Sequence, residues 1–228
     1  MGGNRMKKLL GMITIGQAPR TDVAPVIEKH LEGRAELVQV GLLDGLSAAQ
    51  IAALALEPGD YVLTSRLLDG SAAIVSREKI RPILDRKIRE IEALGVSNIL
   101  LLCTGSFPGL RSAKVHLIEP DRIIPPAVQA MADGRRLGLI GPLPEQGGQL
   151  DLKFSSLVQP AFAAASPYTS GEAEFRQATE SLKGRVELIL LDCMGYDERH
   201  RQWVANASAG IPVILSNALM GKLVAEMV

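Results

Sequence analysis

The chain contains two cysteines, Cys103 and Cys193, and both occupy the same kind of place. Each follows a largely apolar run, ILLL at 99–102 and LILLD at 188–192, and each has a glycine two residues further on. A lone cysteine at the end of an apolar strand is more often a small buried hydrophobe than a reactive group. The paired placement, with no third cysteine in the chain, favours a joint chemical role.

Two opposed thiols suit inversion at a carbon next to a carbonyl group. One thiolate removes the proton from one face of that carbon, and the other thiol delivers a proton to the opposite face. A thiol is competent for this task when helix N-termini or nearby donors lower its pKa from about 8.5 toward working pH. The residue types therefore predict acid–base chemistry without a cofactor.

Alternating strands and helices must position these thiols. Strands that are apolar at every position are typical of parallel sheets covered by helices on both faces. The patterns predict an α/β protein with strands at 8–15, 35–40, 61–67, 72–76, 98–102, 136–140, 186–191 and 212–215. They predict helices at 21–30, 47–56, 78–94, 125–131, 175–182, 198–209 and 218–227.

The chain also has the signs of an internal repeat. The segments LGMI at 10–13 and LGLI at 137–140 each lie upstream of one cysteine. The separations differ, 103 − 11 = 92 against 193 − 138 = 55, and an insertion around the predicted hairpin at 61–76 accounts for much of the difference. Ligands bind beyond the carboxyl ends of strands in open α/β sheets. Two related halves facing each other would therefore bring both thiols to one cleft.

Composition and motifs narrow the classes of partner. The formal net charge is +0 and aromatic residues make up 4%, so neither nucleic acid nor an anionic membrane surface is expected as a partner. The first apolar run reads as a strand rather than a secretion signal, and no segment is long enough to span a membrane. Two cysteines without a CxxC pair fit a reducing cytoplasm. The three histidines share no metal-ligand spacing and no dinucleotide or phosphate-binding loop is present, so we expect no cofactor and no metal.

Several stretches resemble the AroM family, within the aspartate/glutamate/hydantoin racemase superfamily. They are TIGQAPR (14–20), LTSRLLDGSAAIVSREKI (63–80), LLCTGSFPGL (101–110), EPDRIIPP (119–126), LIGPLPEQ (139–146) and LLDCMGY (190–196). The resemblance implies two pseudo-symmetric parallel-sheet α/β domains with a cleft between them. One domain would comprise 1–118 and 215–228, carrying Cys103 and closed by the C-terminal helix. The other would comprise 119–214 and carry Cys193.

The resemblance also assigns roles to residues. Cys103 and Cys193 match the two catalytic thiols of the racemases, and Thr104 matches the residue that holds a substrate carboxylate beside the first thiol. The loops after the first strand of each half line the cleft in that superfamily. The candidate ligand-binding residues are Gln17, Arg66, Thr104, Gly105, Ser106, Pro142, Gln146, Met194, Gly195 and Tyr196. The sequence departs from the racemase pattern at two places, MGY after Cys193 and QAPR at 17–20. These departures argue against an amino-acid substrate more than against the fold.

Some interpretations depend on the residue types themselves. Gln17 and Gln146 follow the first strand of their halves, and a neutral amide can bond a carboxylate or an amide. Arg66, ahead of Arg20, is the candidate for pairing with a carboxylate through two N–H groups. Asp192 precedes Cys193, and strand alternation predicts that its side chain points away from the thiol.

These features predict a cofactor-independent racemase, epimerase or isomerase that acts on a small carboxylate or amide. The same two-thiol cleft also suits cis–trans isomerisation or decarboxylation. The alternative is a non-catalytic small-molecule binding protein that retains the cleft, for which the departure after Cys193 is the best support. A homodimer is the default expectation for an enzyme of this size.

Overall fold

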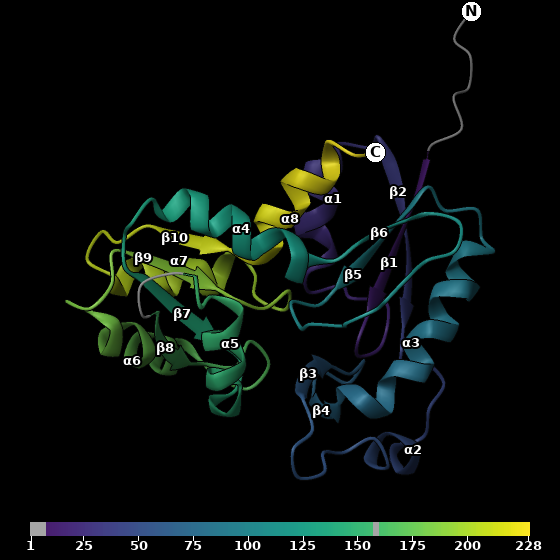
Figure 1. Cartoon of the computed structure of the whole chain (residues 1–228), viewed down its shortest axis with the longest axis horizontal. Coiled ribbons are helices and arrows are strands. Elements are labelled where there is room, and N and C mark those ends of the chain that lie inside the picture. Colours follow the sequence, from purple (N-terminus) through teal and green to yellow (C-terminus); the bar gives the residue numbers. More distant parts are fainter. Residues whose placement is uncertain (1–7, 157–159) are drawn as a thin grey trace, which may run out of the picture.

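The computed structural model describes residues 8–156 and 160–228, and it shows two α/β halves side by side (Figure 1). The strands are β1 (Lys8–Thr14), β2 (Ala35–Gly41), β3 (Val62–Arg66), β4 (Ala72–Ser76), β5 (Asn98–Leu102), β6 (His116–Ile118), β7 (Leu137–Gly141), β8 (Ala161–Ala164), β9 (Leu188–Leu191) and β10 (Val213–Leu215). The helices are α1 (Ala24–Leu31), α2 (Ala48–Ala52), α3 (Arg77–Glu92), α4 (Pro120–Ala132), the 3-10 turn η1 (Pro144–Gln146), α5 (Gly147–Lys153), α6 (Glu172–Leu182), α7 (Glu198–Ala207) and α8 (Ser216–Ala225).

Each half is built on a four-stranded parallel sheet, and the two sheets share one topology. The first has the order β2-β1-β5-β6, and the second, read from its other edge, has the order β8-β7-β9-β10. Strand β7 therefore takes the place of β1, and β9 the place of β5. The prediction of an α/β fold with two related halves is confirmed.

The strand registers make the two cysteines structurally equivalent. Gly11 of β1 pairs with Ile99 of β5, and Gly138 of β7 pairs with Ile189 of β9. Cys103 lies four residues after Ile99, and Cys193 lies four residues after Ile189. Each thiol thus follows the same point on the equivalent strand, at the carboxyl edge where open α/β sheets bind ligands.

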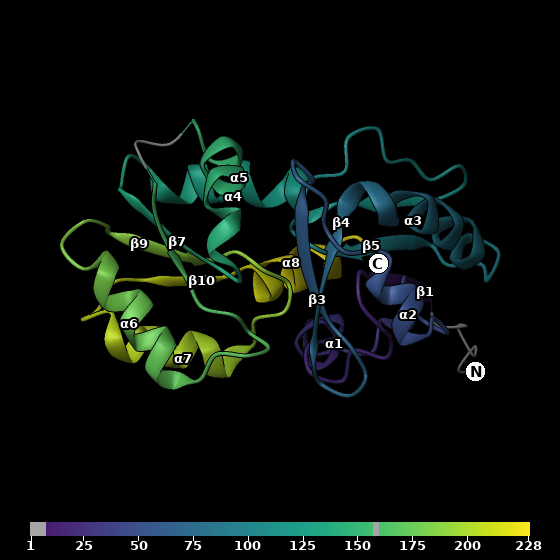
Figure 2. The ribbon, with the colours of Figure 1, turned by 90° about the horizontal axis from the view of Figure 1, so that it is seen from below.

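The halves exchange helices. The chain leaves β6 of the first sheet into α4, which packs toward the second half, and leaves β10 of the second sheet into α8, which returns to pack along α1 (Figures 1 and 2). Gly221 permits this close approach, because a Cβ there would lie 2.9 Å from Cδ2 of His30. One apolar cluster contains residues from both sheets and from these three helices. The exact limits 1–118 with 215–228, and 119–214, stay a prediction.

An antiparallel hairpin distinguishes the first half from the second. Strands β3 and β4 pair with each other, and Leu63 lies opposite Val75. Along the chain, these strands and α2 come between β2 and α3. Only α6 separates the equivalent strands β8 and β9 of the second half. The hairpin is thus part of an insertion, as the unequal spacing of the repeat predicts.

Some elements differ from the sequence prediction. The short strands β6 and β8 were not predicted, because β6 has three residues and AFAA of β8 is alanine-rich, and alanine is depleted in strands. Helix α4 begins at Pro120 rather than at the Pro125-Pro126 pair, which lies inside it, although proline usually marks a first turn. In the described part of the chain no helix is long and apolar enough to cross a membrane.

Candidate active site

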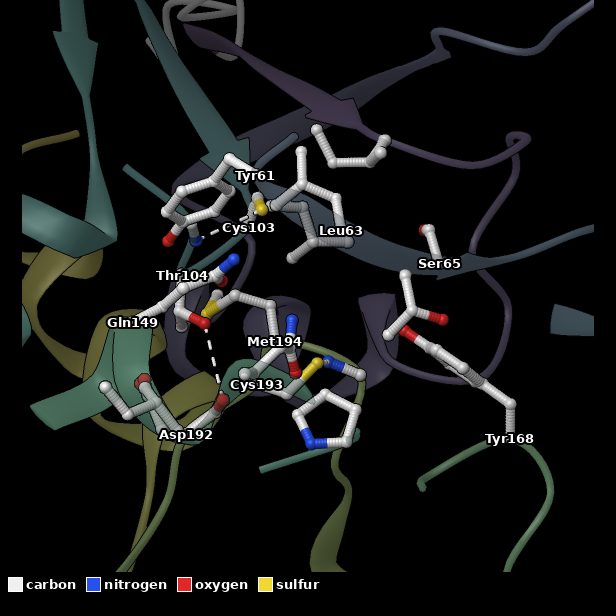
Figure 3. Close-up of a pocket in the computed structure, with 18 residues that line it drawn as sticks. Tyr61, Leu63, Ser65, Cys103, Thr104, Gln149, Tyr168, Asp192, Cys193 and Met194 are labelled. Atoms are coloured by element: carbon white, nitrogen blue, oxygen red, sulfur yellow. Dashed lines mark hydrogen bonds between the residues drawn. The ribbon is translucent and has the colours of Figure 1, made fainter. Parts of the chain in front are cut away.

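A small pocket between the two halves contains both cysteines (Figure 3). Its enclosed volume is about 30 Å³, which is room for water-sized molecules. Its walls come from the strand ends of both sheets, from hairpin strand β3 and from the η1–α5 segment. The lining residues are Ile15, Tyr61, Leu63, Thr64, Ser65, Leu102, Cys103, Thr104, Gly105, Pro142, Gln146, Gln149, Leu150, Tyr168, Asp192, Cys193, Met194 and Gly195.

The two thiols have matching local geometry. The backbone N–H of Gly105 donates to Sγ of Cys103 at 3.2 Å, and the N–H of Gly195 donates to Sγ of Cys193 at 3.3 Å. Both cysteines are free and half-buried, and they enter the pocket from opposite sides in Figure 3. A backbone donor aimed at each sulfur stabilises a thiolate there. The structure therefore gives both cysteines the same arrangement.

Burial outweighs those donors in the free protein. Desolvation raises the pKa of Cys103 to about 12, although the Gly105 N–H and the Lys153 ammonium act in the opposite direction. Desolvation likewise raises the pKa of Cys193 to about 11, against the Gly195 N–H and Arg20. The free protein therefore does not show the lowered pKa that would make a thiol reactive at working pH, because desolvation outweighs the donors around each sulfur.

These raised pKa values give a pH dependence of stability. The pKa of a thiol in the unfolded chain is about 8.5, so above that pH the unfolded chain loses protons that the folded chain keeps. Stability that the thiols contribute is complete below about 8.5 and is lost as the pH rises toward 11 and 12. We expect urea denaturation under reducing conditions to show a loss between pH 8.5 and 10. The loss should be smaller in Cys103→Ser/Cys193→Ser, and an equal loss in that variant would refute the assignment.

A buried cation ties the two cysteine segments together. Nζ of Lys153 on α5 donates to the backbone oxygen of Thr104 at 2.9 Å and to Oδ2 of Asp192 at 2.9 Å. The Lys153 side chain is 8% exposed and that of Asp192 is fully buried. Burial raises the pKa of Asp192, and Lys153 opposes that shift. One ammonium thus joins the residue after Cys103 to the residue before Cys193.

The prediction that the Asp192 side chain points away from the Cys193 thiol stays a prediction. Strand β9 ends at Leu191, so the alternation of strand side chains does not extend to position 192. Asp192 lines the pocket, and its backbone oxygen accepts a hydrogen bond from Oγ1 of Thr104 at 3.4 Å. Its carboxylate is turned to Lys153 and, at 3.5 Å, to the hydroxyl of Ser216.

A second polar group supports the opposite side of the pocket. The Arg20 side chain is 2% exposed and donates to both carboxylate oxygens of Asp22, to Thr14 and, at 3.5 Å, to Oγ of Ser65. Its guanidinium also lies 5.7 Å from the centre of the Tyr168 ring. All of these partners belong to the protein itself, so Arg20 stabilises the pocket wall.

Tyr168 packs closely against the loop after Cys193. A Cβ on Gly195 would lie 2.2 Å from the Tyr168 hydroxyl oxygen, so only glycine fits there. Burial raises the pKa of Tyr168, which keeps its hydroxyl protonated. Tyr168 therefore presents a neutral O–H group beside Cys193.

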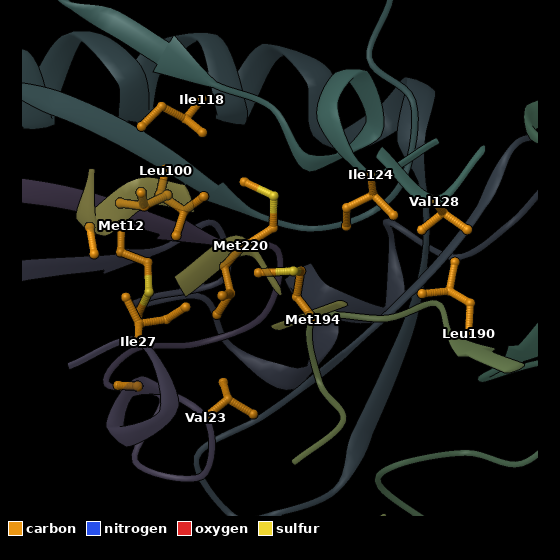
Figure 4. Close-up of a cluster of buried hydrophobic side chains, with 14 of the residues drawn as sticks. Met12, Val23, Ile27, Leu100, Ile118, Ile124, Val128, Leu190, Met194 and Met220 are labelled. Carbon is orange, nitrogen blue, oxygen red and sulfur yellow. The ribbon is translucent and has the colours of Figure 1, made fainter. Parts of the chain in front are cut away.

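Most of the ligand-binding candidates lie in the pocket. With the cysteines, the structure brings together Thr104, Gly105, Pro142, Gln146, Met194 and Gly195. Met194 is 1% exposed and also belongs to the apolar cluster shared by the halves, near Met220 (Figure 4). Met194 therefore contributes to the core as well as to the pocket lining.

Four candidates lie outside the pocket lining. Gln17 connects two loops, because its Nε2 donates to the backbone oxygen of Leu43 and its Oε1 accepts from the N–H of Leu68. Arg66 is 32% exposed and lies 3.9 Å from Asp22. Of the two arginines it is Arg20, not the favoured Arg66, that is buried beside the pocket.

The other two outlying candidates, Ser106 and Tyr196, make hydrogen bonds within the protein. The N–H of Ser106 donates to the hydroxyl of Tyr61 at 3.3 Å, and its oxygen accepts from Arg77 at 3.1 Å. These bonds fix the loop after Cys103. Tyr196 is fully buried, and its hydroxyl donates to the oxygen of Ala165 at 2.8 Å.

Sequence reasoning missed Tyr61, Thr64, Tyr168 and Lys153. Tyr61 and Thr64 belong to the inserted hairpin, and TSRLLDGS marks only a turn. Tyr168 follows the unpredicted strand β8, and Lys153 lies on a helix that carries no pattern of its own. In the described residues, no group of three or more His, Cys, Asp or Glu side chains is placed to hold a metal ion.

Comparisons with solved structures agree with this arrangement. The chain resembles glutamate racemase isoform RacE1 from Bacillus anthracis with a TM-score of 0.65 and 13% identity, covering 96% of this chain and 81% of that one. It resembles the maleate isomerase Iso from Pseudomonas putida S16 with a TM-score of 0.61 and 11% identity, covering 96% and 93%. Allantoin racemase from Klebsiella pneumoniae matches with a TM-score of 0.57 and 16% identity, covering 97% and 87%. The chain thus has the two-domain fold of the Asp/Glu racemases.

Sequence comparison identifies the family. No functionally curated protein matches the chain. The pattern of a family described as AroM protein matches residues 10–228, nearly the whole length. The chain therefore belongs to the AroM family.

Proposed function

We propose that this protein is a cofactor-independent racemase, epimerase or isomerase that acts on a small carboxylate or amide, with Cys103 and Cys193 as the acid–base pair. The observation that carries the proposal is the equivalence of the two thiols. Each follows the same point of the equivalent strand, accepts a bond from the N–H two residues on, and lines one pocket. Free thiols fit a reducing compartment such as the cytoplasm.

The proposed step balances in protons and electrons. One Sγ thiolate takes the proton on the carbon next to the carbonyl, and the electron pair of that C–H bond moves into an enolate. The second thiol gives its proton to the opposite face of the same carbon. The first cysteine ends as a thiol and the second as a thiolate, ready for the reverse direction.

The raised pKa values are compatible with this chemistry. A thiolate with a pKa of about 11 is scarce at neutral pH, but it is a stronger base than an ordinary thiolate. Removing a proton from carbon requires a strong base. Burial in the pocket lowers the fraction of each cysteine that is thiolate, but it makes that thiolate more basic. The backbone N–H on each sulfur supports the thiolate form once it has formed.

The test is deuterium exchange in D2O. A panel of small chiral carboxylates and amides is incubated with the protein, and each is analysed by NMR and on a chiral column. We expect deuterium at the inverted carbon of the substrate. A compound that raises the melting temperature without exchange or conversion would instead identify a binding protein.

A further inference from the structure

Two residues of the pocket lining carry buried polar atoms that have no hydrogen-bond partner. Among the described residues, three buried side-chain polar atoms lack a hydrogen bond, namely Oγ1 of Thr64, Oε1 of Gln146 and Oδ1 of Asn217. Thr64 and Gln146 both line the pocket. An unpaired buried polar group is destabilising, so native proteins rarely keep one without a use. Two in one pocket, contributed by different halves, point to a ligand.

The orientation of the Gln146 amide is fixed by its other bond. Nε2 donates to the backbone oxygen of Val62 at 3.3 Å, across the junction of the two halves. Because that partner accepts only, the amide nitrogen must face it and Oε1 is left as the free atom. Gln146 therefore offers an acceptor, and a ligand must bring an N–H or O–H group to it. The Thr64 hydroxyl can donate to a ligand oxygen.

The charges around the pocket disfavour an anionic ligand. Among the described residues, no lysine or arginine lines the pocket, and the one carboxylate in the lining belongs to Asp192. The two cations behind the walls are already engaged, Arg20 by Asp22 and Lys153 by Asp192 and Thr104. A substrate carboxylate would therefore be buried without a free cation to pair with. A neutral ligand avoids that cost.

We propose that the substrate is a neutral carbonyl compound with an adjacent N–H group, that is, an amide, imide or ureide. Its carbonyl oxygen accepts from the Thr64 hydroxyl, and its N–H donates to Oε1 of Gln146. This inference rests on the proposed function and selects the amide side of the carboxylate-or-amide expectation. The enclosed volume of about 30 Å³ means that the walls part when such a ligand enters, so small probes are the appropriate ones.

Three small probes of related shape separate the alternatives. Succinimide has carbonyl groups and an N–H, N-methylsuccinimide lacks the N–H, and succinate is the open dianion. All are achiral, so inversion leaves them chemically unchanged and binding is measured alone. By calorimetry and by the shift in melting temperature, we expect succinimide to bind about tenfold or more tighter than either other probe. Tighter binding of succinate, or no binding of any probe, would overturn the proposal.

Two variants test the named contacts. Gln146→Leu should abolish the preference for succinimide over N-methylsuccinimide, whereas a steric effect of the methyl group would leave that preference intact and refute the contact. Thr64→Val keeps the shape and should weaken both imides about tenfold. Thr179→Val, at a buried threonine of α6 outside the pocket lining, is the matched control and should bind like the parent protein. Imide binding without deuterium exchange anywhere in the panel would refute the enzyme and leave the ligand class standing.

Discussion

Cys103→Ser and Cys193→Ser are each expected to stop proton abstraction from one enantiomer of the substrate and to spare the other. In a two-base mechanism each thiol faces one side of the reacting carbon, and a serine hydroxyl is far too weak a base to replace it. Loss of a general base lowers the rate by about 10²- to 10⁴-fold. The measurement is deuterium incorporation from each pure enantiomer, with the substrate identified by the D2O panel.

The two variants serve as controls for each other. Inversion should be lost in both, because it requires both thiols, but the enantiomer that still exchanges should differ between them. Serine is close to cysteine in size, so both variants should retain the fold and unfold within about 1–2 kcal/mol of the parent protein. Loss of exchange from both enantiomers together with a lower melting temperature would instead show that the cysteines serve packing. Unchanged inversion in either variant would refute the acid–base pair.

Local patterns predicted the fold and the pairing of the cysteines. The LGMI and LGLI segments occupy the equivalent strands β1 and β7, and buried all-apolar strands carry a strong signal. Cys103 directly follows β5, and Cys193 lies two residues after the end of β9, so the repeat in the sequence corresponds to a structural repeat. Short strands without β-branched residues, such as β8, could not be predicted from the sequence, because pairing within the sheet rather than local preference determines them.

Residues placed by tertiary contact were beyond the sequence. Arg66 and Arg20 look alike in sequence, but Arg20 is the buried one and bonds to Asp22, Thr14 and Ser65. Tyr168 and Lys153 act at the site from a loop and a short helix whose places depend on how the second half packs. The departure after Cys193 was informative, because Met194 joins the core between the halves.

Lys153→Met is expected to be the most damaging single change to stability near the site. The side chains of Lys153 and Asp192 are 8% and 0% exposed, and their charged atoms lie 2.9 Å apart. Removing one member of a buried pair leaves the other charge without compensation and costs about 3–5 kcal/mol. Asp121, 3.8 Å from the ammonium, would then face Asp192 with no cation between them. Urea denaturation at pH 7 measures the loss directly.

The sign of the effect with pH separates this explanation from loss of packing. Burial already raises the pKa of Asp192, and loss of the Lys153 ammonium raises it further. Protonation of Asp192 in the variant then relieves the uncompensated charge, so the difference from the parent protein should shrink as the pH falls. Lys153→Met/Asp192→Asn should recover much of the stability at pH 7, because both charges are gone. Arg136→Met, at an exposed ion pair with Glu187, is the matched control and should cost less than about 1 kcal/mol.

A pH-independent loss, not recovered in the double variant, would mean that Lys153 contributes its methylene packing. A recovered double variant that fails to exchange deuterium would show that the pair also aligns the two cysteine segments, since Lys153 bonds to the residue after one thiol and to the residue before the other.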